Sequence, residues 1–189
     1  MVSIRLVSGG HSFSAAELKQ TICENSALLV VVDTHRVTLV PSEHFVAEEA
    51  AKYLAINGLM PQADEEVVWS NPSADIVAVM AVSRNAKCSI EALFQGEIEW
   101  YTPLLDSTHS DSVCCCLEIT PTACYVRLYD NNGLRLAEAL QTSSEVEILY
   151  YITQIFEIEK FTAATPIYLR GNNTHSKTLK KYFKKVICE

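Results

Sequence analysis

Several features are scarce or missing in this 189-residue sequence, and each one excludes a class of protein. Basic residues number 15 against 23 acidic ones, so the formal net charge is -8. Binding to nucleic acid or to an anionic membrane surface generally needs a basic face, so neither partner is expected. Apolar runs such as Ala27 to Val32 are far shorter than the roughly 20 residues that cross a bilayer. No basic-then-apolar leader is apparent, and we expect a cytoplasmic protein.

Metal-binding and catalytic patterns are also missing. The seven cysteines include no Cys-x-x-Cys pair, and Cys114, Cys115 and Cys116 are adjacent, so in a strand they would alternate between its two faces. We therefore expect no metal site and reduced, mostly buried thiols. A redox protein would need a reactive thiol among them. The run His109-Ser110-Asp111 has the residue types of a catalytic triad, but a triad converges from separate elements, so no catalytic residue is assigned.

What the sequence does contain is most complete between Val113 and Gly171. Three strand-like runs are separated by short turns, and Asn131-Asn132-Gly133 between the last two is a strong hairpin signal. Ser144 and Glu147 form a capping-box pattern that predicts the start of an amphipathic helix. The strands are predicted at 113–119, 123–129, 134–140 and 167–169. A terminal helix is predicted at 176–187, with a lysine-rich outer face and with Leu179, Tyr182, Phe183 and Val186 facing inward.

The first half has a similar succession of strands and helices. Polar residues 106–112 separate the halves and predict a linker between two domains, 1–105 and 113–189. The turn Asp33-Thr34-His35 is ordinary hairpin chemistry. Strands are predicted at 3–7, 11–15, 27–33, 36–40, 67–69, 75–82 and 97–101, and helices over about 42–57 and 83–95.

Particular motifs resemble an uncharacterised bacterial family, known as domain of unknown function 3822. They are Ser3-Ile4-Arg5-Leu6-Val7, Gly10-His11-Ser12-Phe13-Ser14, Leu39-Val40-Pro41-Ser42-Glu43-His44-Phe45, Glu145-x-x-Ile148-Leu149-Tyr150-Tyr151, Leu169-Arg170-Gly171 and Tyr182-Phe183. Known members have an actin-like ATPase fold. The resemblance implies a mixed α/β protein with two related, ribonuclease H-like lobes in a minimal, degenerate form. It does not by itself imply ATP hydrolysis, because function belongs to sites rather than to folds.

The resemblance also implies where a nucleotide would bind. In actin-like ATPases, each lobe opens with a hairpin that brings an acidic residue and a glycine to the phosphates and Mg²⁺. Here the first hairpin contains Gly9 and Gly10 but no acidic residue. The second contains Glu118 and Thr120, but Pro121 follows, and proline has no backbone N–H to donate to a phosphate. The adenosine strand of that superfamily usually ends in two glycines, and this chain has Gly171 alone.

Intact architectural motifs combined with incomplete phosphate motifs favour a non-catalytic protein-binding or scaffold module whose partner is another protein. The contact surface is expected to be the basic terminal helix or a cleft between the lobes. The alternative is a nucleotide-binding switch, ATPase or kinase of the actin-like superfamily. It would bind ATP and Mg²⁺ through Gly9, Gly10, Glu118, Thr120 and Gly171.

Overall fold

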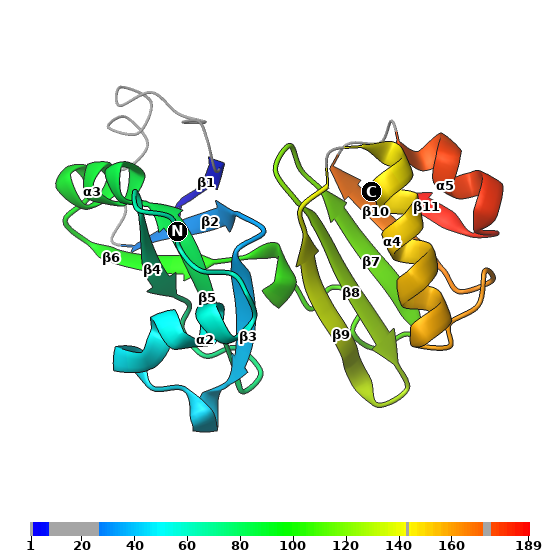
Figure 1. The fold of residues 1–189 in the computed structure, drawn as a ribbon, viewed down its shortest axis with the longest axis horizontal. Helices are drawn as coiled ribbons and strands as arrows, with labels where there is room; N and C mark the ends of the chain where they lie inside the picture. The colour runs from blue at the N-terminus through cyan, green and yellow to red at the C-terminus, as the bar shows by residue number, and fades with distance from the viewer. Residues whose placement is uncertain (1, 8–26, 143, 172–174) are drawn as a thin grey trace. The chain divides into compact units, whose positions relative to one another are not determined.

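The computed structural model describes residues 2–7, 27–142, 144–171 and 175–189. The chain divides into two compact units, Met1–Leu105 and Asp106–Glu189, and each is described separately below (Figure 1). Residues 106–112, for which the sequence predicts a linker, belong to the second unit. Among the described residues, no helix combines the length and the apolar character that a membrane span requires.

The described residues of the first unit form two three-stranded sheets. In one sheet β2 lies between β1 and β6, and all three strands are parallel; in the other β5 lies between β3 and β4, and both pairs are antiparallel. Each described strand that the sequence predicts in this half is present within two residues of its expected bounds, and the strand predicted at 11–15 lies outside the described residues. The strands are β1 (Val2–Val7), β2 (Ala27–Asp33), β3 (Val37–Pro41), β4 (Glu65–Trp69), β5 (Ile76–Ser83) and β6 (Glu97–Tyr101).

The α-helices in the described part of the first unit are α2 (Ala50–Ile56) and α3 (Arg84–Leu93). The expected start of the first one near Ser42 is wrong, because two short 3-10 turns, η1 (Ser42–His44) and η2 (Ala47–Glu49), precede α2. The chain is extended between these turns, where the Tyr53 hydroxyl donates to the carbonyl of His44 at 2.6 Å and accepts from the amide of Val46 at 3.1 Å. A side chain four positions into α2 thus holds an extended segment that helical periodicity alone does not reveal.

One five-stranded sheet forms the second unit, in the order β11-β10-β7-β8-β9. The hairpin signal is confirmed: β7, β8 and β9 form an antiparallel meander, with Asp130 paired to Gly133 at the second turn. β10 and β11 are parallel to β7 and follow the helices α4 and α5. The strands are β7 (Cys114–Ile119), β8 (Cys124–Asp130), β9 (Gly133–Leu140), β10 (Ile167–Gly171) and β11 (Val186–Cys188).

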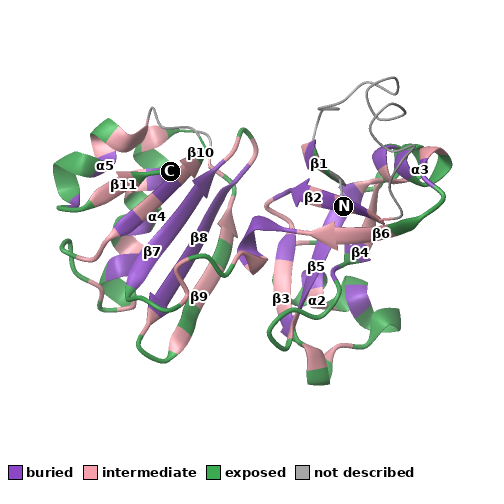
Figure 2. Cartoon of the chain, turned by 180° about the vertical axis from the view of Figure 1, so that it is seen from behind, coloured by how far each residue is buried: buried purple, intermediate pink, exposed green. Residues whose placement is uncertain are grey.

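Helix α4 (Glu145–Ile158) begins where the capping box predicts, and the Ser144 hydroxyl accepts a hydrogen bond from the amide of Glu147 at 3.3 Å. Its inner face packs with α5 against one face of the sheet, which forms the main core of the unit. Each fully buried side chain of this size stabilises the fold by roughly 1.5–3 kcal/mol. In Figure 2, β7 and β8 are buried along their length. The inner residues of α4 are Ile148, Ile152, Ile155 and Phe156.

The terminal helix is shorter than its periodicity predicts. α5 covers Ser176–Tyr182, and Phe183 is extended and buried against Phe156, with ring centroids 5.0 Å apart. Beyond it the amide of Lys184 donates to the carbonyl of Ala163, which turns the chain into β11. The expected inward position of Tyr182 is wrong, since this residue is 59% exposed. Pairing with the open edge of β10 overrides the helical pattern here.

Candidate functional site

The structure assembles part of the residue set that the sequence assigns to a nucleotide. Gly9 and Gly10 lie outside the described residues. Glu118, Thr120 and Gly171 lie at the ends of the parallel strands β7 and β10, where Gly171 pairs with Ile119 and Arg170 with Glu118. The side chain of Glu118 is buried, with 8% of the residue exposed.

The hydroxyl of Thr120 is used by the turn between β7 and β8. It donates to the carbonyl of Ala123 at 3.0 Å and accepts from the amides of Ala123 and Thr122, at 3.1 and 3.4 Å. The amide of Thr120 donates to the same carbonyl of Ala123 at 2.9 Å. These hydrogen bonds stabilise the turn between β7 and β8.

Gly171 is a glycine for a steric reason. Its φ of +85° is a backbone conformation that side chains rarely adopt, and a Cβ added there would lie 2.2 Å from the carbonyl oxygen of Ile119. The neighbouring strand, and not an open cradle, occupies the space that the missing side chain leaves. Thr120 and Gly171 thus serve the turn and the strand packing, and the assignment of Glu118, Thr120 and Gly171 to a nucleotide stays a prediction.

A second polar cluster lies on the sheet face opposite α4, and sequence analysis did not identify it. At its centre is Asp106, whose Oδ1 accepts from the amide and hydroxyl of Thr108 at 2.9 and 2.6 Å. Its Oδ2 contacts the guanidinium groups of Arg127 and Arg170. The main-chain carbonyl of Asp106 accepts from Arg127 and from the hydroxyl of Tyr129. Side chain and backbone together fix residues 106–108 on the sheet.

The carboxyl of Asp106 is ionised over a wide pH range. Burial raises its pKa, but the hydrogen bonds from Thr108 and the charges of Arg127 and Arg170 outweigh burial and lower the pKa from 3.8 to about 2. Arg127 is only 2% exposed, so it needs this partner. We refer to Asp106, Arg127, Arg170, Glu189 and His109 together as the Asp106 network.

The network extends to the last residue of the chain. Glu189 accepts from Nε of Arg170 at 2.9 Å, and its other oxygen lies 2.6 Å from Nε2 of His109. The ring of His109 stacks on Tyr168, with centroids 3.7 Å apart and planes 9° apart. Burial opposes ionisation of Glu189, but His109 and Arg170 lower its pKa overall. Thus a segment near the start of the unit and the end of the chain are joined through one arginine.

The Asp106 network consists of carboxylates paired with cations. Cys116, whose thiol contacts the carbonyl of Thr108 at 3.8 Å, has a pKa raised to about 12 by burial and by its neighbour Cys114, so it holds its proton at neutral pH. Each carboxylate of the network already faces a cation. Within the described ranges, no three His, Cys, Asp or Glu side chains are grouped as metal ligands.

The turn between β2 and β3 in the first unit is also held by its own contacts. Asp33 and Thr34 are fully buried at the end of β2, and the Thr34 hydroxyl accepts from the amide of Arg36 at 3.1 Å. Arg36 forms two hydrogen bonds with Glu65, at 2.9 and 2.8 Å. Burial, and then the charge of Arg36, lower the pKa of His35. These contacts confirm a turn here, but the interpretation of it as a hairpin is wrong, because β2 and β3 belong to different sheets.

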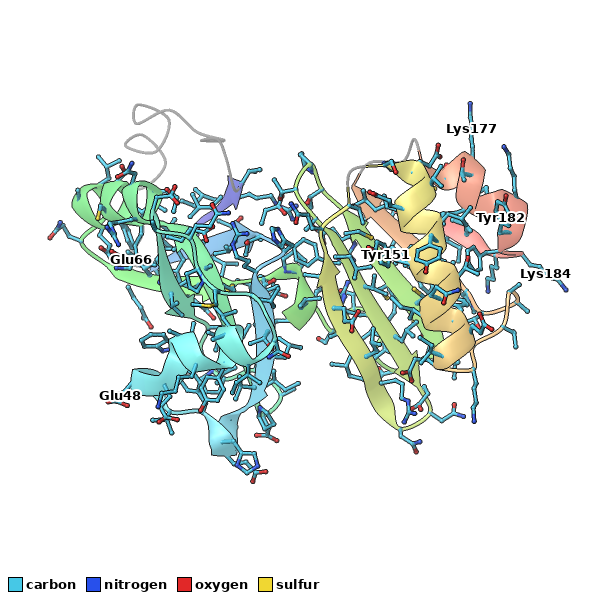
Figure 3. All side chains as sticks on the ribbon, viewed as in Figure 1. Glu48, Glu66, Tyr151, Lys177, Tyr182 and Lys184 are labelled. Carbon is cyan, nitrogen blue, oxygen red and sulfur yellow. The ribbon has the colours of Figure 1, made fainter. Side chains whose placement is uncertain are left out.

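The outer surface of the helical layer in the second unit is the remaining candidate. Four apolar side chains of α4 point away from the core: Val146, Tyr150, Tyr151 and Ile158, exposed by 74%, 59%, 38% and 70%. Tyr150 and Tyr151 contact each other edge to face at 5.5 Å, and Figure 3 shows Tyr151 on the outside of α4. The same figure shows Tyr182, Lys177 and Lys184 projecting from α5 and its end. We call the four α4 residues the α4 apolar face.

Comparison with known proteins assigns the chain to a family. A family model described as "Protein of unknown function (DUF3822)" matches residues 17–186. The chain belongs to that family. The family resemblance inferred from the sequence motifs is thereby confirmed. A comparison with curated proteins gave no match.

Solved structures establish the fold. A Bacteroides thetaiotaomicron protein with an actin-like ATPase fold and unknown function matches with a TM-score of 0.74 and 18% identity, over 94% of this chain and 77% of that one. The PilM–PilN type IV pilus biogenesis complex matches with a TM-score of 0.52 and 14% identity, over 93% and 74%. The cytoplasmic domain of EpsL, an inner-membrane component of the Vibrio cholerae type II secretion system, gives 0.48 and 11%, over 88% and 80%. The predicted mixed α/β, actin-like fold is confirmed.

Proposed function

We propose that this chain is a cytoplasmic, non-catalytic protein-binding module of the actin-like fold, with 1–105 and 113–189 as its two lobes. The α4 apolar face is the observation that carries the proposal. Exposed apolar side chains that are grouped on one element commonly mark a protein interaction site. A helix with apolar residues on its outer as well as its inner side is typical of one that is covered on both sides.

Two further observations support this function. Thr120 and Gly171, which a nucleotide would need, are used by the turn and by strand packing. One solved structure that shares the fold is itself a protein–protein complex, PilM with PilN. Together they favour binding of a protein over turnover of ATP.

The experiment has a nucleotide arm and a protein arm. Thermal unfolding is measured with and without millimolar Mg-ATP and Mg-ADP, and we expect no change in Tm. A ligand at 100 times its Kd would add about 2.7 kcal/mol, which shifts Tm by several degrees. A saturable shift would contradict the proposal, and Glu118→Gln would then locate the site. Gly171 variants are unsuitable here, because the fold itself requires that glycine.

For the protein arm, the purified chain captures partners from an extract of its own cells. Tyr150→Ser with Ile158→Ser should lower the captured amount of a specific partner at least several-fold. The matched control is Ile56→Ser with Met60→Ser, which alters two similarly exposed apolar residues of the first unit, 81% and 68% exposed. Equal losses in both variants, or no specific partner for the unaltered chain, would contradict the proposal.

A further inference from the structure

The cations of the described chain include two groups that differ in ion pairing. The first group is paired with carboxylates: Arg36, Lys52, Arg84, Lys87, Arg127, Arg135 and Arg170. The second group lies on α5 and directly after it, and within the described ranges its members form neither an ion pair nor a side-chain hydrogen bond. We call this second group the α5 lysine cluster: Lys177, Lys180, Lys181, Lys184 and Lys185, all of them exposed.

The spacing of these lysines concentrates their charge. Lys177, Lys180 and Lys181 recur at intervals of three and four residues, which places their side chains on one side of α5. This helical part of the cluster is about 6 Å long at 1.5 Å per residue. Lys184 and Lys185 come after the extended residue Phe183, and Figure 3 shows Lys184 projecting outward like Lys177. Five lysines within residues 177–185 exceed what one phosphate group contacts and suit an extended partner.

An apolar surface accompanies the charge. Tyr182 lies within the cluster and is 59% exposed. α5 and α4 belong to one layer, because Leu179 and Phe183 share the core with Ile152 and Phe156. The α4 apolar face and the α5 lysine cluster are therefore parts of the same helical layer. A partner that covers both must supply apolar side chains and negative charge.

We propose that the α5 lysine cluster is the docking site for an acidic, partly apolar segment of a partner protein; this rests on the proposed protein-binding function. The negative charge of the rest of the chain favours a short acidic segment over a large anionic partner. Residues 177–189 contain five lysines and one glutamate, a net +4, so the rest of the chain carries -12. A nucleic acid or an anionic membrane extends beyond the cluster and is repelled by that remainder, whereas a short acidic segment contacts only the cluster.

Selection of short random peptides, displayed and bound to the full chain, tests the chemistry of the partner. Counter-selection uses a variant in which all five lysines of the cluster are glutamine. We expect enriched peptides to combine Asp or Glu with apolar residues. Their affinity should fall about tenfold or more in the five-glutamine variant, and it should weaken as salt screens the charges.

Two control measurements keep the result specific. Lys52→Gln with Lys160→Gln removes exposed lysines elsewhere and should leave peptide affinity unchanged. Unchanged thermal unfolding of the five-glutamine variant confirms that it folds. Enriched peptides without acidic residues, equal binding to both proteins, or no enrichment would overturn the proposal. Oligo-dT or phosphatidylserine vesicles that bind the unaltered chain and not the variant would also overturn it, in favour of a nucleic acid or a membrane.

Failure of this inference is distinguishable from failure of the proposed function. If a specific cellular partner is lost on substitution of the α4 apolar face but retained by the five-glutamine variant, the module binds protein and the lysine cluster is not its docking site. If millimolar Mg-ATP shifts the unfolding of both proteins equally, the proposed function itself fails.

Discussion

The two faces of the five-stranded sheet in the second unit use their cations in opposite ways. On one face Arg127 and Arg170 are buried or half-buried and paired with Asp106. On the other face, the helical layer carries the five lysines of the α5 lysine cluster, which are exposed and without an ion pair in the described chain. Cations that hold the fold together are thus separated from cations that are available to a partner. The comparison predicts large stability effects on the first face and small ones on the second.

The largest effect is expected for Asp106→Asn. This substitution leaves the buried Arg127 guanidinium without its counter-charge, which should lower the free energy of unfolding by about 3 kcal/mol. Chemical denaturation measures the change. Asp111→Asn, which alters an exposed carboxyl in the same segment, is the control and should change stability by less than about 0.5 kcal/mol. Similar values for both variants would contradict the assigned role of the Asp106 network.

A comparable but smaller loss is expected for Gly171→Ala, at the edge shared by β10 and β7. The new Cβ would meet the carbonyl of Ile119, in addition to the strain of a positive φ, so we expect roughly 2–3 kcal/mol. Gly58→Ala carries the strain alone, because nothing lies within 4 Å of the position that its new Cβ would take, and should cost roughly 1 kcal/mol. If Gly58→Ala were the more damaging substitution, strand packing would not explain Gly171.

Acid should lower the free energy of unfolding through the Asp106 network. The pKa of Asp106 is about 2 in the folded chain and 3.8 for an unperturbed aspartate, so its ionised form stabilises the fold above pH 4. That contribution, roughly 2 kcal/mol, is lost as pH falls from about 4 to about 2. Denaturation at a series of pH values measures it. Asp106→Asn should show a correspondingly weaker dependence in this range, and an unchanged dependence would count against the low pKa.

The smallest effect is expected on the other face. Replacing the five lysines of the α5 lysine cluster by glutamine should change the free energy of unfolding by no more than about 0.5 kcal/mol, because exposed and unpaired charges contribute little. Denaturant titration of this variant beside Asp106→Asn gives the comparison directly. A loss as large as that of Asp106→Asn would show that the cluster serves the fold.

Local patterns in the sequence predicted much of this fold because local interactions determine those elements. The Asn-Gly hairpin and the Ser144 capping box each depend on residues within a few positions, and both are confirmed. The terminal helix was predicted too long, since the strand pairing of Val186–Cys188 with β10 depends on residues far away in the chain. The early helix start near Ser42 was wrong for a similar reason, the contacts of Tyr53 with the preceding segment.

The Asp106 network could not be predicted, because its members lie 21 and 64 residues apart in the chain. Two arginines in otherwise apolar strands, Arg127 and Arg170, were the available signal. Buried arginines indicate that acidic residues pair with them, but the sequence pattern does not identify those acidic residues. By contrast, the exposed lysines of α5 followed from helical spacing, although Tyr182 was placed on the wrong side of that helix.

Lysine footprinting tests the central claim most directly. An amine-reactive reagent is applied to the purified chain and to the chain bound to its partner in an extract of its own cells, and labelling is measured by mass spectrometry. We predict that labelling of the α5 lysine cluster falls on binding, while Lys52 and Lys87 of the first unit react equally in both samples. Protection of Lys52 or Lys87 with the cluster unchanged would contradict the account.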